Sequence, residues 1–215
     1  MRIQGGTAAR RACLAVLAAT MMALTFGSSA PANDGLLDLS CGYEASHPFL
    51  PWLDPSPYTL IPDGGFEGGA KGWKLKDGAK VVSGNEPYYV AGPGAHSLYL
   101  PPGSSATSPS MCVQLVLPTV RFMSVGGSLF TYLKVEVLYR DAAGKQRAVE
   151  LLPGATPTSR WQPTLPLLQL GGALSLLTLD GVTTEMQFRF TPTGVLGGGK
   201  WRIDNVFVDP WKDFL

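Results

Sequence analysis

The chain has 215 residues, a formal net charge of +1, 15% charged side chains, 26 Gly and 18 Pro. Its length suits a single domain with a substantial core, and its balanced charge excludes the broad basic surface that nucleic-acid binding needs. Gly and Pro are spread through the chain and separate short runs rich in Val, Leu, Phe, Tyr and Thr, which favours an all-β fold over long helices.

Residues 1–32 have the pattern of a secretory signal peptide. Three arginines precede an uncharged run from Ala12 to about Phe26, and small residues follow this run as far as Ala32. A basic segment, a short apolar segment and a small-residue cleavage site are the parts of such a peptide, and the apolar run is too short to span a membrane. We therefore expect a secreted, extracellular protein that begins at Asn33 and has no membrane span.

An N-terminal arm, residues 33–56, is expected to precede a sandwich domain at residues 57–215. Of the three cysteines, Cys13 leaves with the signal peptide, so that Cys41 and Cys112 remain as an even pair in an oxidising compartment. We expect these two to form a disulfide bond, which would attach the arm to the sandwich. In the chain-entropy model, closing such a loop stabilises the fold by about 4 kcal/mol.

Nine or ten segments read as short strands because of their β-branched and aromatic composition or their alternation. They are Tyr58–Ile61, Gly72–Leu75, Lys80–Ser83, Ser97–Leu100, Met111–Leu115, Thr119–Ser124, 132–140, Lys145–Leu152, 185–190 and Trp201–Val208. This number and spacing predict an antiparallel β-sandwich of the jelly-roll type. The apolar segment Leu165–Leu179 is left open as a short helix, a buried strand or a capping loop.

Two of these strands show the clearest alternation of apolar and polar side chains. Leu133, Val135, Val137 and Tyr139 share one face of the first, and Met186, Phe188 and Phe190 share one face of the second, so these faces should be buried. The opposite, polar parity offers candidate ligand-binding residues that we expect to converge on one concave sheet face. They are Arg121, Tyr132, Lys134, Glu136, Gln187 and Arg189, with Tyr88 and Tyr89 as a rim. A merely solvated sheet face would carry the same residue types.

Three motifs resemble those of carbohydrate-binding jelly-roll modules with the galactose-binding-like fold. They are Gly65-Phe66-Glu67 followed by Gly72-Trp73, His96-Ser97-Leu98-Tyr99-Leu100, and Trp201-Arg202-Ile203-Asp204-Asn205-Val206. Together they cover most of residues 58–208 in the order of that group. The resemblance implies that Trp73 and Trp201 lie in the core. It also implies a structural calcium ion held by Glu67 and Asp204, for which hard oxygen ligands are suited. The alternative for these two carboxylates is that they accept hydrogen bonds in turns.

No catalytic motif appears in the sequence. His47 and His96 are the only imidazoles, and neither a Gly-x-Ser-x-Gly elbow nor a His-Glu-x-x-His helix is present. The leading hypothesis is therefore a secreted, non-catalytic binding module for carbohydrate or another cell-envelope component. The alternatives are a structural or protein-interaction sandwich without a small-ligand site and a carbohydrate-active hydrolase. The hydrolase would use two facing carboxylates from the set Glu136, Glu150, Asp180 and Glu185.

Overall fold

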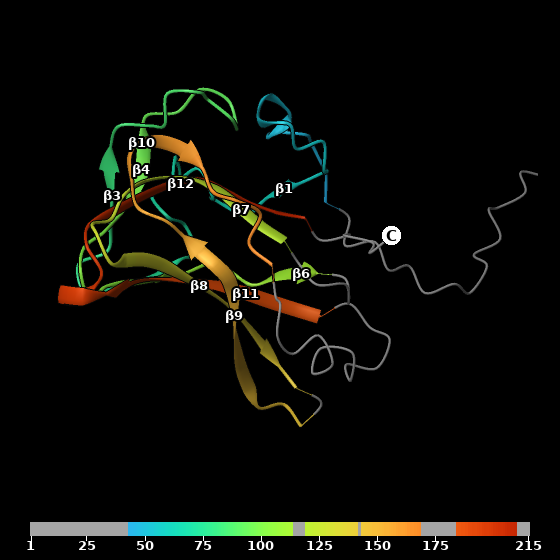
Figure 1. The fold of residues 1–215 in the computed structure, drawn as a ribbon. Coiled ribbons are helices and arrows are strands. Elements are labelled where there is room, and N and C mark those ends of the chain that lie inside the picture. The colour runs from blue at the N-terminus through green and yellow to red at the C-terminus, as the bar shows by residue number, and fades with distance from the viewer. Residues whose placement is uncertain (1–42, 114–118, 142, 169–183, 210–215) are drawn as a thin grey trace, which may run out of the picture. The chain divides into compact units, whose positions relative to one another are not determined.

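The computed structural model describes residues 43–113, 119–141, 143–168 and 184–209. Within them the chain forms two sheets in which every strand pair is antiparallel, packed face to face (Figure 1). The first sheet has the order β10-β7-β12-β4-β3, with β1 paired to β12, and the second has the order β2-β5-β11-β8-β9, with β6 paired to β11. Successive strands cross repeatedly from one sheet to the other, as in jelly rolls. The prediction of an antiparallel β-sandwich is confirmed.

The strands agree closely with the segments expected from the sequence. They are β1 (Thr59–Leu60), β2 (Lys74–Lys76), β3 (Lys80–Ser83), β4 (His96–Leu100), β5 (Ser105–Thr107), β6 (Met111–Val113), β7 (Thr119–Gly126), β8 (Thr131–Arg140), β9 (Gln146–Ala155), β10 (Thr158–Pro163), β11 (Thr184–Gly194) and β12 (Trp201–Asp209). Two 3-10 turns, η1 (Leu50–Trp52) and η2 (Val195–Gly197), complete the described elements. Two strands, β5 and β10, were not expected. β5 has three residues, and β10 is mostly polar and ends in proline.

The core lies between the two sheets and is built from the expected alternation. Val135 and Val137 of β8 are fully buried, and so is Phe188 of β11. Each such side chain stabilises the fold by about 1.5–3 kcal/mol relative to an exposed position. Trp73 and Trp201 are 8% and 1% exposed and belong to the same cluster, as the motifs implied.

The segment before β1 packs on the outer side of the first sheet. Ser46 bridges to Tyr58 through two backbone hydrogen bonds, and Phe49 is fully buried against Tyr58 and Phe207. These residues, with Met123, form a second small apolar cluster outside the main core. Residues 43–57 thus cover part of one outer side of the sandwich.

Edges of the second sheet are formed by β2 and β9. The β8–β9 hairpin extends away from the body of the sandwich (Figure 1). Asp141 closes the hairpin, since its carbonyl accepts the Gly144 N–H and its N–H donates to the Lys145 carbonyl.

Several expectations fall wholly or partly outside the described residues. They concern the signal peptide, most of the arm, and Cys41 with its predicted bond to Cys112. Cys112 lies on β6, where its N–H donates to the Tyr43 hydroxyl at 3.1 Å. Of the segment Leu165–Leu179, Leu167 bridges to Val120 and Leu168 bridges to Leu152, while residues 169–179 are not described. In the described part of the chain, no helix has the length and apolar character needed to cross a membrane.

Candidate functional site

Strand register brings most of the predicted ligand-binding residues together on the outer side of the second sheet. Arg189 of β11 lies opposite Glu136 of β8, and the next outward-facing pairs are Thr191 with Lys134 and Thr193 with Tyr132. Gln187 lies one pair further along, opposite Leu138. We call the surface formed by Tyr132, Lys134, Glu136, Gln187 and Arg189 the polar face.

Glu136 is the centre of a charged network on the polar face. Its Oε2 accepts a hydrogen bond from Arg189 Nε at 2.9 Å, and its Oε1 lies 3.4 Å from Lys134 Nζ. The Glu136 side chain is only 12% exposed. Burial raises the pKa of Glu136, but the Arg189 and Lys134 cations outweigh burial and hold it below its ordinary value. Glu136 is therefore an anion held in one orientation by two cations.

The polar face has one aromatic side chain among the predicted residues, Tyr132. Burial and the neighbouring Glu150 carboxylate raise the pKa of Tyr132. At the other end, Gln187 Nε2 donates to the Ser108 carbonyl at 3.1 Å. Both ends of the face are thus fixed by neighbouring strands.

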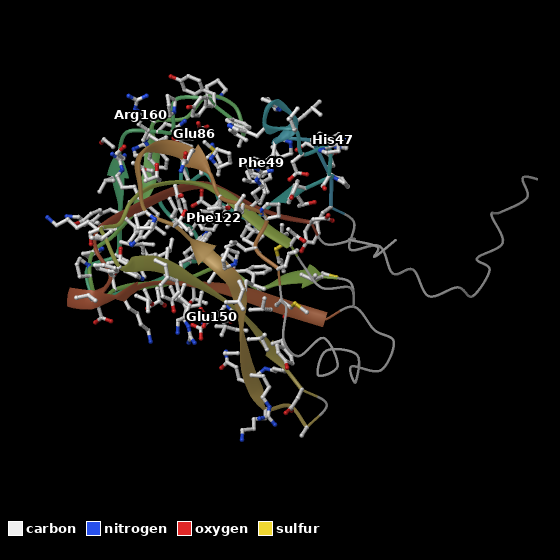
Figure 2. The ribbon with its side chains drawn as sticks, in the orientation of Figure 1. His47, Phe49, Glu86, Phe122, Glu150 and Arg160 are labelled. Atoms are coloured by element: carbon white, nitrogen blue, oxygen red, sulfur yellow. The ribbon has the colours of Figure 1, made fainter. Side chains whose placement is uncertain are left out.

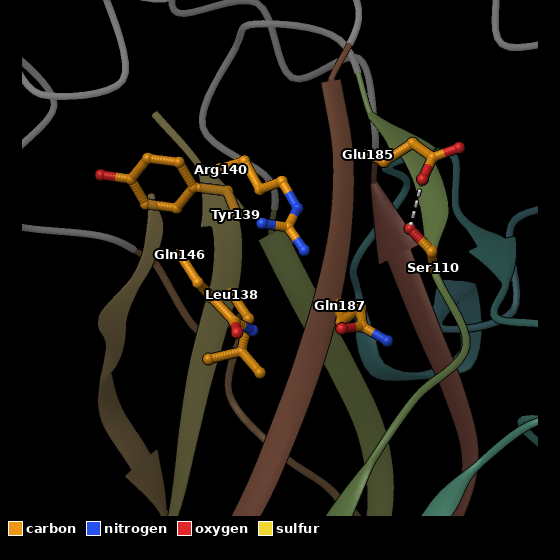
Figure 3. A pocket seen from close by; sticks show the side chains of 7 residues that line it. All are labelled: Ser110, Leu138, Tyr139, Arg140, Gln146, Glu185 and Gln187. Carbon is orange, nitrogen blue, oxygen red and sulfur yellow. Dashed lines mark hydrogen bonds between the residues drawn. The ribbon is translucent and has the colours of Figure 1, made fainter. Parts of the chain in front are cut away.

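A pocket of about 230 Å³ adjoins the polar face at Gln187 (Figure 3). Its other lining residues are Ser110, Leu138, Tyr139, Arg140, Gln146 and Glu185. Ser110 donates to Glu185 across its rim at 3.0 Å, as Figure 3 shows. The volume is below the range of about 300–1,000 Å³ in which pockets enclose a whole ligand. The pocket has room for one protruding group of a ligand that lies mainly on the open face.

Arg121 does not share this face, which corrects the expectation that it would. It lies on β7 in the other sheet and is 6% exposed beneath the N-terminal segment. Its Nη1 pairs with Asp54, its Nε donates to the Thr164 carbonyl, and its guanidinium lies 4.5 Å from the Phe49 ring centre. As the alternation predicted, Arg121 points to the outer side of its strand, but the N-terminal segment covers the sheet at this position.

Tyr88 and Tyr89 also lie on the side opposite the polar face, in the connection between β3 and β4. They are 54% and 56% exposed. The fully buried Glu86 anchors this loop, because its carboxylate accepts the N–H groups of Tyr88 and Val90 and the side-chain amide of Asn205. Figure 2 shows Glu86 and Glu150 on opposite sides of the sandwich, with Phe122 between them. The two tyrosines are therefore no rim for the polar face.

The two carboxylates implied as calcium ligands are engaged by the protein itself. Glu67 Oε1 accepts the N–H groups of Ala95 and His96 at 2.8 Å each, and its Oε2 lies 3.0 Å from His96 Nδ1. The His96 hydrogen bond is the main reason why the pKa of Glu67 is lowered. Asp204 is fully buried and accepts the N–H groups of Glu86 and Asn205.

These contacts do not fit a calcium cage. No group of three or more His, Cys, Asp or Glu side chains in the described ranges is arranged to hold a metal ion. Burial raises the pKa of Asp204 to about 7, helped by the charges of Glu86 and Glu67 and opposed by its two N–H donors. The geometry is that of carboxylates that fasten loops, and the calcium ion remains a prediction from the resemblance.

The two histidines and Glu136 are all engaged by other groups of the protein. His47 Nδ1 lies against the Pro55 carbonyl, and His96 faces Glu67. Ser97, next to His96, is fully buried and interacts with Arg202. Glu136 and Glu150 lie opposite each other on neighbouring strands, but the lowered pKa of Glu136 is the reverse of what a general acid needs. Asp180 lies outside the described residues.

Sequence reasoning missed four residues that organise the covered side: Trp52, Glu86, Trp161 and Arg202. Trp52 and Trp161 pack against the small apolar cluster around Phe49. Arg202 lies with its guanidinium carbon 5.6 Å from the Trp161 ring centre. Trp161 belongs to β10, a strand that the sequence did not reveal, and its position next to Arg202 depends on pairing between distant segments.

Comparison with known proteins gave structural similarities alone. No family model and no curated protein matches the chain. Among solved structures, the chain is similar to TmCBM61 in complex with β-1,4-galactotriose, at 18% identity and a TM-score of 0.42 over 71% of this chain and 98% of the other. The CBM22-1 xylan-binding domain of Paenibacillus barcinonensis Xyn10C has 14% identity and a TM-score of 0.47, over 70% and 94% of the two chains.

A third similar structure is a putative sugar binding protein from Bacteroides thetaiotaomicron, at 10% identity and a TM-score of 0.46 over 71% of this chain and 99% of the other. At these values each similarity is weak. What this chain binds therefore has to come from its own side chains.

Proposed function

We propose that the chain is an exported, non-catalytic binding module that holds a carbohydrate chain on the polar face. The observation that carries this proposal is the fixed network of Glu136, Lys134 and Arg189 on an open sheet surface. Sugar hydroxyls need planar donors and acceptors in fixed positions, and a carboxylate and a guanidinium supply both. Because these three side chains are already ordered, the protein loses little side-chain entropy when a ligand binds.

The shape of the site supports binding of an extended ligand. The polar face crosses neighbouring strands, and the small pocket at Gln187 and Arg140 goes deeper. Such a surface suits the length of a polysaccharide or another envelope glycan. The motif resemblance to carbohydrate-binding modules and the expected signal peptide point to the same role outside the cell.

The disulfide between Cys41 and Cys112, expected from the cysteine count, is a further part of this proposal. The Cys112 N–H donates to the Tyr43 hydroxyl at 3.1 Å, which joins the arm to β6. This contact places a residue two positions after Cys41 beside β6, which supports the pairing. The disulfide takes no part in the proposed contacts with sugar.

A glycan array followed by calorimetric titration tests the proposal. The exported protein should bind at least one glycan, and Glu136→Gln and Arg189→Met should each lower its affinity about tenfold or more, since each removes charged hydrogen bonds worth about 1.5–3 kcal/mol. Lys71→Met, which removes an exposed cation elsewhere on the surface, should leave affinity unchanged.

The proposal fails if no glycan binds, or if the bound glycan is retained equally by Glu136→Gln and Arg189→Met. Thermal unfolding of each variant is the control for folding. Turnover of the bound glycan, detected as new reducing ends, would support the hydrolase alternative instead. Variants of Glu150 would then identify its partner carboxylate.

A further inference from the structure

The outer side of the first sheet carries an aromatic surface that the polar face does not explain. Trp52 and Trp161 both pack, half-buried, on the apolar cluster formed by Phe49, Tyr58, Met123 and Phe207. Tyr88 extends this surface, since its ring lies 5.2 Å from Trp52 in an edge-to-face arrangement and is more than half exposed. We call the surface formed by Trp52, Tyr88, Tyr99, Trp161 and Arg202 the aromatic face.

A row of side chains crosses the aromatic face from strand to strand. Arg202 of β12 lies between Val125 of β7 and Tyr99 of β4, and Tyr99 lies opposite Lys80 of β3. Trp161 of β10 covers Arg202 from the side of β7. Because neighbouring strands are about 4.8 Å apart, the four paired residues span about 14 Å. This is a length over which a surface can contact several units of a chain.

The protein orients the Arg202 guanidinium through two of its three nitrogen atoms, Nε and Nη2. Its Nε and Nη2 donate to Ser97 Oγ, and Nη2 also donates to the carbonyls of Ser83 and Gly84. No hydrogen bond from Nη1 to another described residue is found. The guanidinium is thus oriented by the protein and keeps a donor group for a ligand.

The exposed charge of the aromatic face is positive. Arg202 and the exposed Lys80 lie in the row, and the exposed Arg160 precedes Trp161. Two acidic residues of this region, Glu86 and Asp204, are fully buried and accept hydrogen bonds from the protein. Figure 2 shows Arg160 on the same side as Glu86, opposite Glu150. A ligand on this face therefore meets cations and aromatic rings together.

We propose that the aromatic face is a second binding surface, separate from the polar face, and that it takes an acidic polysaccharide whose sugar units carry carboxylates. Aromatic rings stack on the C–H faces of sugar rings, and arginine pairs with a carboxylate through charged hydrogen bonds. Arg202 lies between the rings of Trp161 and Tyr99, and Lys80 follows Tyr99, so cations and rings are interleaved on this face. With two faces on opposite sides, one molecule would link two glycan chains.

Titration with oligogalacturonate and with its methyl ester tests this inference. The wild type should bind the acid form and lose about tenfold or more in affinity for the ester, which has the same sugar rings without the charge. Trp161→Ala should lower affinity for the acid form about tenfold or more, and Trp161→Phe should restore most of it. Lys80→Met should lower it about threefold and should weaken its dependence on salt.

Glu136→Gln serves as the matched control, because it alters the polar face alone. If Glu136→Gln removes binding of oligogalacturonate and Trp161→Ala does not, the acid binds on the polar face and the second surface is wrong. Equal binding of dextran sulfate would also overturn the inference, since it would show attraction of any polyanion. If the array yields a glycan lost in Glu136→Gln while oligogalacturonate never binds, the second surface fails and the polar face stands.

Discussion

The two outer sides of the sandwich differ in what stabilises them. On the polar face, side chains from β8 and β11 pair with one another, and Glu136 forms ion pairs with both Lys134 and Arg189. On the opposite side, Phe49 and Tyr58 come from outside the sheet and are fully buried against it. The strands of the second sheet thus stabilise their own outer side, whereas the segment before β1 packs on the outer side of the first sheet.

The two sides should therefore respond differently to substitution, one in stability and the other in ligand affinity. Burial of apolar surface stabilises a fold by far more than exposed ion pairs do. We therefore expect substitutions beneath the N-terminal segment to alter unfolding, and substitutions on the polar face to alter ligand affinity with little effect on unfolding.

Phe49→Ala gives the sharpest contrast between the two sides. Phe49 is fully buried and makes edge-to-face contacts with Tyr58 and Phe207 at 5.2 and 5.6 Å. Its truncation should lower the free energy of unfolding by about 3–5 kcal/mol, because it leaves a cavity and exposes Arg121 to a changed environment. Chemical denaturation measures this change.

Lys134→Ala is the matched truncation on the polar face and should cost less than about 1 kcal/mol, as exposed ion pairs do. If the two variants unfold at the same denaturant concentration, the N-terminal segment does not stabilise the sheet as described.

The pH dependence of unfolding provides a second, smaller contrast. Burial raises the pKa of Asp204 to about 7 in the folded state, from an ordinary value near 3.8. Since the folded protein then binds the proton more tightly than the unfolded chain, this group stabilises the fold at low pH and loses that contribution as the pH rises through 7. Between pH 8 and pH 6 we expect a gain of about 1.4 kcal/mol, or a rise in Tm of about 3–5 °C.

Asp204→Asn removes the titrating group, so the difference in Tm between pH 6 and pH 8 should shrink by that amount. The remaining pH dependence, common to both proteins, comes from other groups. An unchanged difference in the variant would show that Asp204 does not titrate in this range.

Chelation should have the smallest effect. Glu67 and Asp204 each accept two or more hydrogen bonds from the protein, so the loops that they fasten hold without an ion. We expect the Tm of the purified protein in EDTA and its Tm in excess calcium to differ by less than about 1 °C. A calcium-dependent rise of several degrees would instead support the ion that the motifs imply.

The sequence predicted the fold well because alternation is a local property. Val135, Val137 and their neighbours are buried by the pleat of their own strand, whatever pairs beside them. β5 and β10 were missed because Ser105–Thr107 and Thr158–Pro163 have few apolar residues, and they become strands only through pairing with β11 and β7.

The candidate site could be predicted only in part, since alternation tells inward from outward and does not tell one outer side from the other. Arg121 and Arg189 have the same outward parity, yet they lie on different sheets. The contact of Asp204 with Glu86 joins residues 118 positions apart. Long-range pairing of this kind decides which polar residues meet, and no local pattern encodes it.

β9 ends the strand order of the second sheet, where Leu168 pairs with it at Leu152 through two backbone hydrogen bonds. An open strand edge offers unpaired backbone groups to other molecules, and proteins that collect along a polymer meet their neighbours often. On β9, Pro153 has no N–H to offer, and Arg147 sits near the hairpin tip with its Nε bound to Asp141. These residues discourage edge-to-edge joining, so a crowd of these molecules on one polymer should stay separate rather than grow into fibres.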